Sequence, residues 1–302
     1  MNYTFPDHIS TAGLKELILQ SDRAFETALL QIANQIASSK SLQMIGLTGP
    51  TCSGKTTAAK MLTECLFQKG KSIHVISIDD FYFEKSYLLY LAGQNESNTL
   101  DYDSEKTIDI PLLAECVSSL LNGKPTLLPH FNFFTGLREC GVRLLPKKGD
   151  LFLFEGIQIL YPNVSAILSG KAYQSIAICP QSGIAVGEAV FSPNEIRLMR
   201  RLVRDMIYRG SLPSFTFSLW ASVRENEEKN IFPNLPSCNF TVDSTMPYEI
   251  SVLKPYLMES LEKMALDDPN RAQADHILQK LKPVKPVDSS LISSNSLYRE
   301  FI

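Results

Sequence analysis

An α/β fold with a mostly parallel sheet of five strands, covered by helices on both faces, is predicted by three observations on this 302-residue sequence. The first is a glycine-rich loop at residues 49–56, which joins a strand-like run to a helix-like run. The second is the alternation of strand-like and helix-like runs along the chain. The third is that three strand-like runs end in residues suited to chemistry, because open α/β sheets bind ligands beyond the carboxyl ends of their strands.

The glycine-rich loop fits the phosphate-binding pattern G-x-x-x-x-G-K-[ST], the P-loop or Walker A motif, at every fixed position. Its glycines let the backbone wrap a phosphate chain, and the following helix points its positive N-terminus at the same anion. The flanking residues 42–47 and 55–67 read as a buried strand and a helix, as the motif requires. We therefore expect nucleotide phosphates to bind at Gly49, Pro50, Thr51, Cys52, Ser53, Gly54, Lys55, Thr56 and Thr57.

The other elements follow from apolar periodicity and from helix and strand breakers. Residues 11–39 predict a helix before the first strand, and residues 193–209 predict an arginine-rich helix. Residues 81–103 are polar and read as irregular, whereas residues 126–145 read as a hairpin or an extended flap. Further strands are expected at residues 72–78, 151–154, 175–179 and 239–242, and a further helix at residues 108–121.

Three parts of the chain are expected from these elements. Residues 1–40 form a helical N-terminal extension, and residues 41–265 form the phosphate-loop domain, with a helical lid at about 193–225. Residues 266–302 are rich in proline and serine and predict an extended tail, with docking of residues 297–302 on the core left open.

Composition narrows the function classes. Hydrophobic residues make up 44%, which suits a packed core, and the net charge of −3 with a pI near 5.9 predicts neither nucleic-acid nor membrane binding. The 6 cysteines are scattered without metal-ligand spacing, which is typical of reduced thiols. With no secretory signal and no apolar stretch near the length of a membrane span, a cytoplasmic location is expected.

Acidic residues at two strand ends suit phosphoryl transfer, which needs an anion cradle, metal-binding oxygens and a group that deprotonates the acceptor. Lys55 would contact the β- and γ-phosphates, and the Thr56 hydroxyl and Glu155 would bind Mg²⁺. Asp79 is the candidate general base and a further candidate metal ligand. Asp80 competes for the base role, and one of the two aspartates is expected to cap the next turn.

Arginines dominate the helix at residues 193–209 and predict a lid over the phosphates. Arg197, Arg201 and Arg204 lie at helical spacing on one face, where guanidinium groups would stabilise developing charge. The alternative is a solvated basic face paired with Glu195 and Asp205. The full run is Arg197, Arg200, Arg201, Arg204 and Arg209.

Together these motifs resemble the uridine kinase / phosphoribulokinase family of P-loop kinases over residues 44–257. Residues 77–82 (SIDDFY) resemble the family's D-x-F-Y segment, which implies Asp79 as catalytic base, and residues 154–157 (FEGI) resemble its metal-binding segment. Residues 101–109 resemble its F-D-x-P-x-A-x-D stretch, which implies that Asp103 holds a ribose. Residues 200–210 are similar to its lid signature R-R-x-x-R-D-x-x-x-R-G, which implies catalytic arginines at Arg201 and Arg204.

Three later segments resemble a bacterial branch of uridine-kinase-like nucleoside kinases: residues 219–224, 229–233 and 248–256. Many members of that branch carry an N-terminal TGS-type domain. This chain begins too late to hold one, so a stand-alone kinase with a helical extension is expected.

The segment that reads the base departs from the family pattern P-x-Y-D-F-x-x-H-x-R. Phe131, Asn132 and Gly136 stand where the family has Tyr, Asp and His. A site discriminates strongly between bases only where it has groups that hydrogen-bond to them, and these three positions have lost such groups. Stacking of a base on Phe131 or Phe133 stays open. The sequence therefore does not predict pyrimidine specificity. The resemblance implies acceptor contacts from Asp103, Tyr82, Phe131, Phe133, Arg138 and Arg209.

The resemblance implies an ATP- and Mg²⁺-dependent kinase acting on the 5′-hydroxyl of a nucleoside such as uridine or cytidine. A second hypothesis keeps the reaction and changes the acceptor, since phosphoribulokinases and pantothenate kinases share this architecture. A third is a non-catalytic nucleotide-binding regulatory protein, against which the intact Asp79 and Glu155 argue. Kinases of this shape are often oligomeric, so a homo-oligomer stays open.

Overall fold

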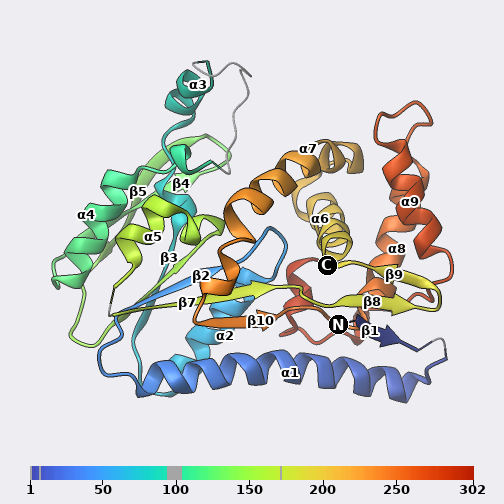
Figure 1. The fold of residues 1–302 in the computed structure, drawn as a ribbon, viewed down its shortest axis with the longest axis horizontal. Coiled ribbons are helices and arrows are strands. Elements are labelled where there is room, and N and C mark those ends of the chain that lie inside the picture. The colour runs from blue at the N-terminus through green and yellow to red at the C-terminus, as the bar shows by residue number, and fades with distance from the viewer. Residues whose placement is uncertain (1, 7, 94–103, 171) are drawn as a thin grey trace.

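The computed structural model describes residues 2–6, 8–93, 104–170 and 172–302. At its centre lies a sheet of five parallel strands in the order β10-β7-β2-β6-β3 (Figure 1). The predicted five-stranded parallel sheet is therefore confirmed. The strands are β2 (Met44–Thr48), β3 (Ile73–Ser77), β6 (Leu151–Glu155), β7 (Tyr173–Cys179) and β10 (Phe240–Asp243).

Alternate residues of the central strands enter two different cores. Ile45 and Leu47 pack in the larger core, whereas Met44 packs in the smaller one. The same alternation splits the neighbouring strand, with Leu153 in the larger core and Phe154 in the smaller. Because strand side chains alternate between faces, a sheet with apolar side chains on both faces must be covered on both sides.

Helices cover those two faces. Helix α1 (Thr11–Ser38) lies lengthwise below the sheet, and α2 (Lys55–Gln68) packs between it and the strands (Figure 1). The smaller core is closed on the other side by α4 (Ile110–Leu121) and α5 (Pro162–Leu168). Helix α6 (Pro193–Arg209) has the predicted bounds and joins the larger core beside α8 (Glu249–Glu262).

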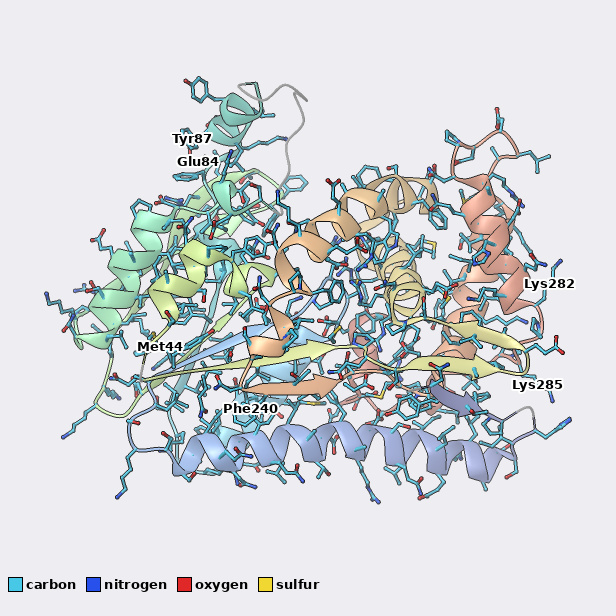
Figure 2. All side chains as sticks on the ribbon, in the orientation of Figure 1. Met44, Glu84, Tyr87, Phe240, Lys282 and Lys285 are labelled. Carbon is cyan, nitrogen blue, oxygen red and sulfur yellow. The ribbon has the colours of Figure 1, made fainter. Side chains whose placement is uncertain are left out.

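A hairpin borders the smaller core, and a short helix precedes it in the chain. Strands β4 (Thr126–Asn132) and β5 (Leu137–Leu144) pair antiparallel, as the sequence predicted for residues 126–145. The stretch expected to be irregular contains helix α3 (Lys85–Gly93), so that part of the prediction was wrong. Figure 2 shows Glu84 and Tyr87 here, at the opposite end of the molecule from Lys282 and Lys285.

The segment expected to be an extended tail is largely folded. Helix α9 (Arg271–Leu281) packs on α8, and 3₁₀ turns follow at Ser289–Leu291 and Leu297–Glu300. Leu281, Tyr298 and Phe301 are buried in the larger core. The prediction failed because the prolines and serines dominate the composition, whereas the few apolar side chains between them decide the packing.

Several short elements gave no clear signal in the sequence. A small second sheet has the order β1-β8-β9 and lies beside α9. Helix α7 (Pro213–Asn226) continues into a π-helical turn, Glu227–Ile231, and occupies the expected lid region. The strands of the small sheet are β1 (Asn2–Phe5), β8 (Gly183–Val186) and β9 (Ala189–Phe191).

Candidate active site

Three neighbouring strands deliver the predicted site residues to one edge of the central sheet. Strand β2 leads into the phosphate loop, and β6 beside it ends at Glu155. Strand β3 follows on the other side of β6, and its Ser77 is paired with Glu155 in register. The Ser77 hydroxyl donates to Glu155 Oε1 over 2.8 Å. The strand order thus brings together the loop, Glu155 and the turn that holds Asp79.

The phosphate loop has a backbone that needs its glycines. Gly49 has φ 153° and Gly54 has φ 93°, both in the region that L-residues rarely adopt. A Cβ atom on Gly49 would lie 2.0 Å from the Ile178 carbonyl oxygen, so no larger residue fits there. Helix α2 begins directly after the loop at Lys55, which aims its first N–H groups at the loop's concave side.

The polar groups of the loop suit a bound anion. Lys55 Nζ donates to the carbonyl oxygens of Gly49 and Pro50, each at 2.9 Å. The hydroxyls of Thr48 and Ser53 are buried and have no hydrogen-bond partner among the described residues. Buried polar groups normally find partners, so these two hydroxyls and the lysine fit a polar ligand such as a phosphate chain.

Two arginines of α6 are buried braces behind the loop. Arg197 is fully buried and donates to Glu227 over 2.6 and 2.8 Å and to the Thr51 carbonyl over 3.2 Å. Glu227 in turn accepts from the Thr51 N–H over 3.2 Å. The expectation that Arg197 shares a phosphate-facing surface with Arg201 and Arg204 was therefore wrong, because its guanidinium is already engaged behind the loop.

Arg200 forms a second buried brace. It donates to Glu249 over 2.6 and 2.9 Å and to the carbonyls of Cys52 and Ser244. Burial by itself would lower the pKa of Arg200, but Glu249 holds that pKa above its ordinary value, so the guanidinium stays charged. Two buried ion pairs thus hold the phosphate loop from behind, and they contact the adjacent loop residues Thr51 and Cys52.

The remaining arginines converge on one carboxylate. Arg201, Arg204 and Arg209 lie within 3.3, 2.9 and 3.3 Å of Asp205, respectively. The alternative prediction, in which the arginines form a basic face paired with acidic residues, expected this pairing with Asp205. Burial would lower the pKa of Arg204, but nearby negative groups, Asp205 among them, hold it above its ordinary value. Three cations on one anion leave net positive charge beside the loop, which favours an anionic ligand.

Asp79 and Asp80 have different partners although they are adjacent. Asp79 Oδ1 accepts from Gln158 Nε2 over 3.4 Å, and the same amide donates to the Tyr82 hydroxyl over 2.8 Å. Asp80 Oδ1 accepts from His130 Nδ1 over 2.9 Å and from the Phe131 N–H over 3.1 Å. Asp80 therefore anchors the β4–β5 hairpin to the turn after β3, which leaves Asp79 as the better candidate base.

Aromatic rings gather on the acceptor side. Tyr82, Phe131 and Phe133 are in edge-on contact, with ring centroids 5.0 to 5.8 Å apart. Tyr82 and Phe131 are buried, whereas Phe133 is 63% exposed. Of the three rings expected to contact an acceptor, Phe133 is the one with a free face.

Arg138 is a brace rather than a free cation. Its Nη1 lies 3.0 Å from Asp109 Oδ2, and its Nη2 donates to the Tyr82 carbonyl over 2.8 Å. Arg209 is 56% exposed and remains on the solvent side of the Asp205 cluster. Asp103, the expected ribose ligand, lies outside the described residues.

The residues that line a cavity of about 390 Å³ include Thr56 and Glu155, two of the three expected metal ligands. Magnesium is commonly held by one or two carboxylates together with substrate phosphates, and a threonine hydroxyl beside a carboxylate suits that chemistry. Asp79, the third expected ligand, does not line this cavity. Among the described residues, no group of three or more His, Cys, Asp or Glu side chains is placed to hold a metal without phosphates.

Sequence reasoning missed four residues: Gln158, Glu227, Glu249 and Glu300. Glu227 and Glu249 carry the buried ion pairs, and Gln158 links Asp79 to Tyr82. Glu300 accepts from both the N–H and the hydroxyl of Thr57. Arg197 and Arg200 lie among the apolar residues of α6, and a buried arginine needs a carboxylate partner. Only the fold shows that the partners are Glu227 and Glu249.

Comparison with known proteins places the chain in a family. The model of the phosphoribulokinase / uridine kinase family matches residues 44–251. A uridine-cytidine kinase C of Dictyostelium discoideum is 30% identical over 68% of this chain. The match covers only 40% of that longer protein. A uridine kinase of Alkaliphilus metalliredigens is 28% identical over 70% of the chain and 93% of its own length. A uridine kinase of Clostridium perfringens is 32% identical over 55% of the chain and 69% of its own length.

Solved structures resemble the chain more loosely. A possible uridine kinase from Bacillus stearothermophilus is 17% identical with a TM-score of 0.48, over 72% of this chain and 98% of that one. A D-glycerate 3-kinase from Cryptococcus neoformans is 16% identical with a TM-score of 0.37, over 92% of this chain and 90% of that one. Neither bears on the substrate at this level of similarity. Within the described residues, no helix is both long and apolar enough to cross a membrane.

Proposed function

The chain belongs to the phosphoribulokinase / uridine kinase family, and we propose that it transfers the γ-phosphoryl group of ATP to the 5′-hydroxyl of a nucleoside-like acceptor. The observation that carries the proposal is the convergence of the phosphate loop, Glu155 and Asp79 at the ends of three adjacent strands. Relatives named uridine kinase, at 28% to 32% identity, support a nucleoside as the acceptor.

The proposed roles follow from chemistry and position. Asp79 takes the proton of the acceptor hydroxyl as its oxygen bonds to the γ-phosphorus. The bond from that phosphorus to the β–γ bridging oxygen breaks, and ADP leaves. Lys55 contacts the β- and γ-phosphates. Arg201 and Arg204 stabilise the negative charge of the phosphoryl group while it is being transferred. Thr56 and Glu155 would hold Mg²⁺, which neutralises phosphate charge when it is bound.

A different small hydroxyl acceptor is a second candidate, favoured by the hairpin tip. Asn132 stands at the family's Asp position, and its Oδ1 accepts from the N–H groups of Phe134 and Thr135. Its Nδ2 donates to Glu139, so the side chain is committed to the turn. Gly136 replaces the family's His with φ 71°, and a Cβ there would lie 2.7 Å from Lys85 Cβ. Stacking on Phe133 would then decide the acceptor more than hydrogen bonds do.

The test is ADP release with ATP, Mg²⁺ and a panel of acceptors, with Lys55→Ala as the blank. The panel holds uridine, cytidine, purine nucleosides, ribulose 5-phosphate and pantothenate. Acceptor-dependent ADP release with a nucleoside, lost in the blank, is expected. Release with ribulose 5-phosphate or pantothenate alone would select the second candidate. ATP binding without turnover of any acceptor would favour a nucleotide-binding regulatory protein.

A further inference from the structure

A carboxylate from the far end of the chain lies on the phosphate-binding helix. Glu300 Oε2 accepts from the Thr57 N–H over 3.1 Å and from the Thr57 hydroxyl over 2.9 Å. Thr57 is the third residue of α2, and Gly54, the residue before the helix, provides no side-chain cap. The N–H groups of a first helical turn have no partner within the helix and attract anions. Glu300 therefore occupies donors that belong to the anion site.

The segment that carries Glu300 is firmly anchored on both sides of it. The Tyr298 ring is fully buried, and its hydroxyl donates to the Glu249 carbonyl over 3.0 Å. Phe301 is also fully buried, and its ring lies 4.8 Å from the Arg200 guanidinium carbon. The same Arg200 and Glu249 brace the phosphate loop. The docked segment and the loop therefore share one buried network.

The segment also touches the loop itself. A Cβ atom on Gly54 would lie 2.2 Å from Leu297 Cδ1, so the leucine is packed directly on the loop's last glycine. A cavity of about 560 Å³ opens beside this contact, and Thr56, Thr57 and Glu300 all line it. Thr57 and Glu300 are thus both reached from the same cavity.

A nucleotide phosphate and the Glu300 carboxylate cannot share the Thr57 donors. Both are anions, and two like charges at hydrogen-bond distance from one donor repel strongly. We propose that Glu300 is an internal competitor of the nucleotide, which must leave Thr57 before a phosphate of the nucleotide can bind there. This inference rests on the proposed function, because it assumes that the loop binds a nucleotide.

The competition has a measurable size. The apparent affinity for the nucleotide equals the intrinsic affinity multiplied by the fraction of molecules in which Glu300 has left Thr57. The Glu300→Gln variant keeps the shape and an acceptor oxygen but removes the charge, and a neutral hydrogen bond is about half as strong as a charged one. We expect this variant to bind ATP about tenfold more tightly than the wild type. Adenosine has no phosphate, so its affinity is expected to stay unchanged.

The experiment is calorimetric titration of the full chain with Mg-ATP, with tripolyphosphate and with adenosine. Glu300→Gln and Glu300→Ala are compared with Glu262→Gln, which removes the same charge from an exposed position on α8. Tighter binding of ATP and of tripolyphosphate by both Glu300 variants, with Glu262→Gln like the wild type, is the expected result.

Two results would overturn the inference, and they can be told apart. If the wild type binds ATP and Glu300→Gln binds it equally or more weakly, Glu300 is a helix cap or a part of the nucleotide site, and the proposed function stands. If neither the wild type nor the Glu300 variants bind ATP better than Lys55→Ala does, the proposed function fails and the inference falls with it. A lower melting temperature of Glu300→Gln without tighter binding belongs to the first case.

Discussion

Two neighbouring aspartates show how far single residues can differ in their surroundings. Asp79 faces the Gln158 amide beside the Tyr82 hydroxyl, whereas Asp80 is committed to His130 and the Phe131 backbone of the hairpin. In the sequence either satisfies the requirement for a carboxylate after a strand, and only the resemblance to the D-x-F-Y segment favours Asp79. Their hydrogen bonds distinguish them: Asp80 anchors the hairpin, and Asp79 stays the candidate base.

We predict that Asp79→Asn and Asp80→Asn have separable effects. Asp79→Asn is expected to lower kcat by about 10²- to 10⁴-fold with little change in melting temperature, because it removes the proton acceptor. Asp80→Asn weakens the hold on the hairpin, so it is expected to raise the acceptor KM and to lower the melting temperature. Steady-state kinetics and thermal unfolding of both variants check this. Near-normal turnover by Asp79→Asn with the best acceptor would contradict its assignment as base.

The pair of Arg200 and Glu249 makes a second prediction at the residue scale. Both side chains are fully buried, so Arg200→Met leaves an uncompensated carboxylate in the core. Breaking such a pair costs about 3–5 kcal/mol of unfolding free energy. The double variant Arg200→Met/Glu249→Gln removes that charge and keeps an acceptor for the Met246 N–H, which donates to Glu249 over 2.8 Å. The double variant is therefore expected to be more stable than the single one.

Urea unfolding of the two variants measures this difference. If Arg200→Met proved as stable as the wild type, or the double variant proved less stable than the single, the buried charge would not be what makes Arg200 necessary.

At the scale of elements, helix α6 is fixed at its N-terminus by one glutamate. Ser192 and Glu195 form a reciprocal capping box, in which the Glu195 carboxylate accepts from the Ser192 N–H over 2.8 Å. The same carboxylate pairs with Lys280 of α9 and lies 3.4 Å from His276. Burial would raise the pKa of Glu195, but hydrogen bonds from Lys280 and Ser192 lower it below its ordinary value.

This pKa predicts the pH dependence of stability. A folded-state pKa below the unfolded value, about 4.3, means that the contribution of Glu195 is present above that pH and is lost as the pH falls. The stability advantage of the wild type over Glu195→Gln is therefore expected to be full at about pH 6 and to shrink towards pH 3. Urea midpoints at several pH values measure this difference, with Glu16→Gln on the exposed side of α1 as control. A constant difference across this range would exclude the linkage.

At the scale of the whole molecule, the chain from residue 266 onward completes the larger core. Leu278, Leu281 and Val284 pack there, and so do Leu297, Tyr298 and Phe301 from the 3₁₀ turns. An unfolded tail would not bury these side chains. The division of the chain at residue 265 that the sequence predicted therefore cuts through a packed core.

We predict that a chain ending at residue 265 loses cooperative unfolding. Truncation exposes the apolar surface of α8 and removes the Tyr298 and Phe301 contacts to the braces of the phosphate loop. Circular dichroism melts of the full and truncated chains measure the effect. A truncated chain with the melting temperature of the full one would show that residues 266–302 are a dispensable appendage.

Much of the fold could be predicted from the sequence because its signals are local. The phosphate loop, the apolar strands and the span of α6 follow from short patterns whose spacing has a physical cause. Helix α9 could not, and docking of residues 297–302 stayed an open possibility, because isolated apolar residues among prolines and serines gain their partners only in the folded chain.

The candidate site divides in the same way. Sequence alone determined which chemical groups are present: a phosphate loop, acidic strand ends and a cluster of arginines. Only the tertiary structure decided which arginines brace the loop, which aspartate anchors the hairpin and that Glu300 lies on Thr57. The physical reason is that a motif fixes its own backbone through neighbouring residues, whereas a polar partner can lie hundreds of positions away, as Glu300 lies 243 positions from Thr57, and is chosen by packing.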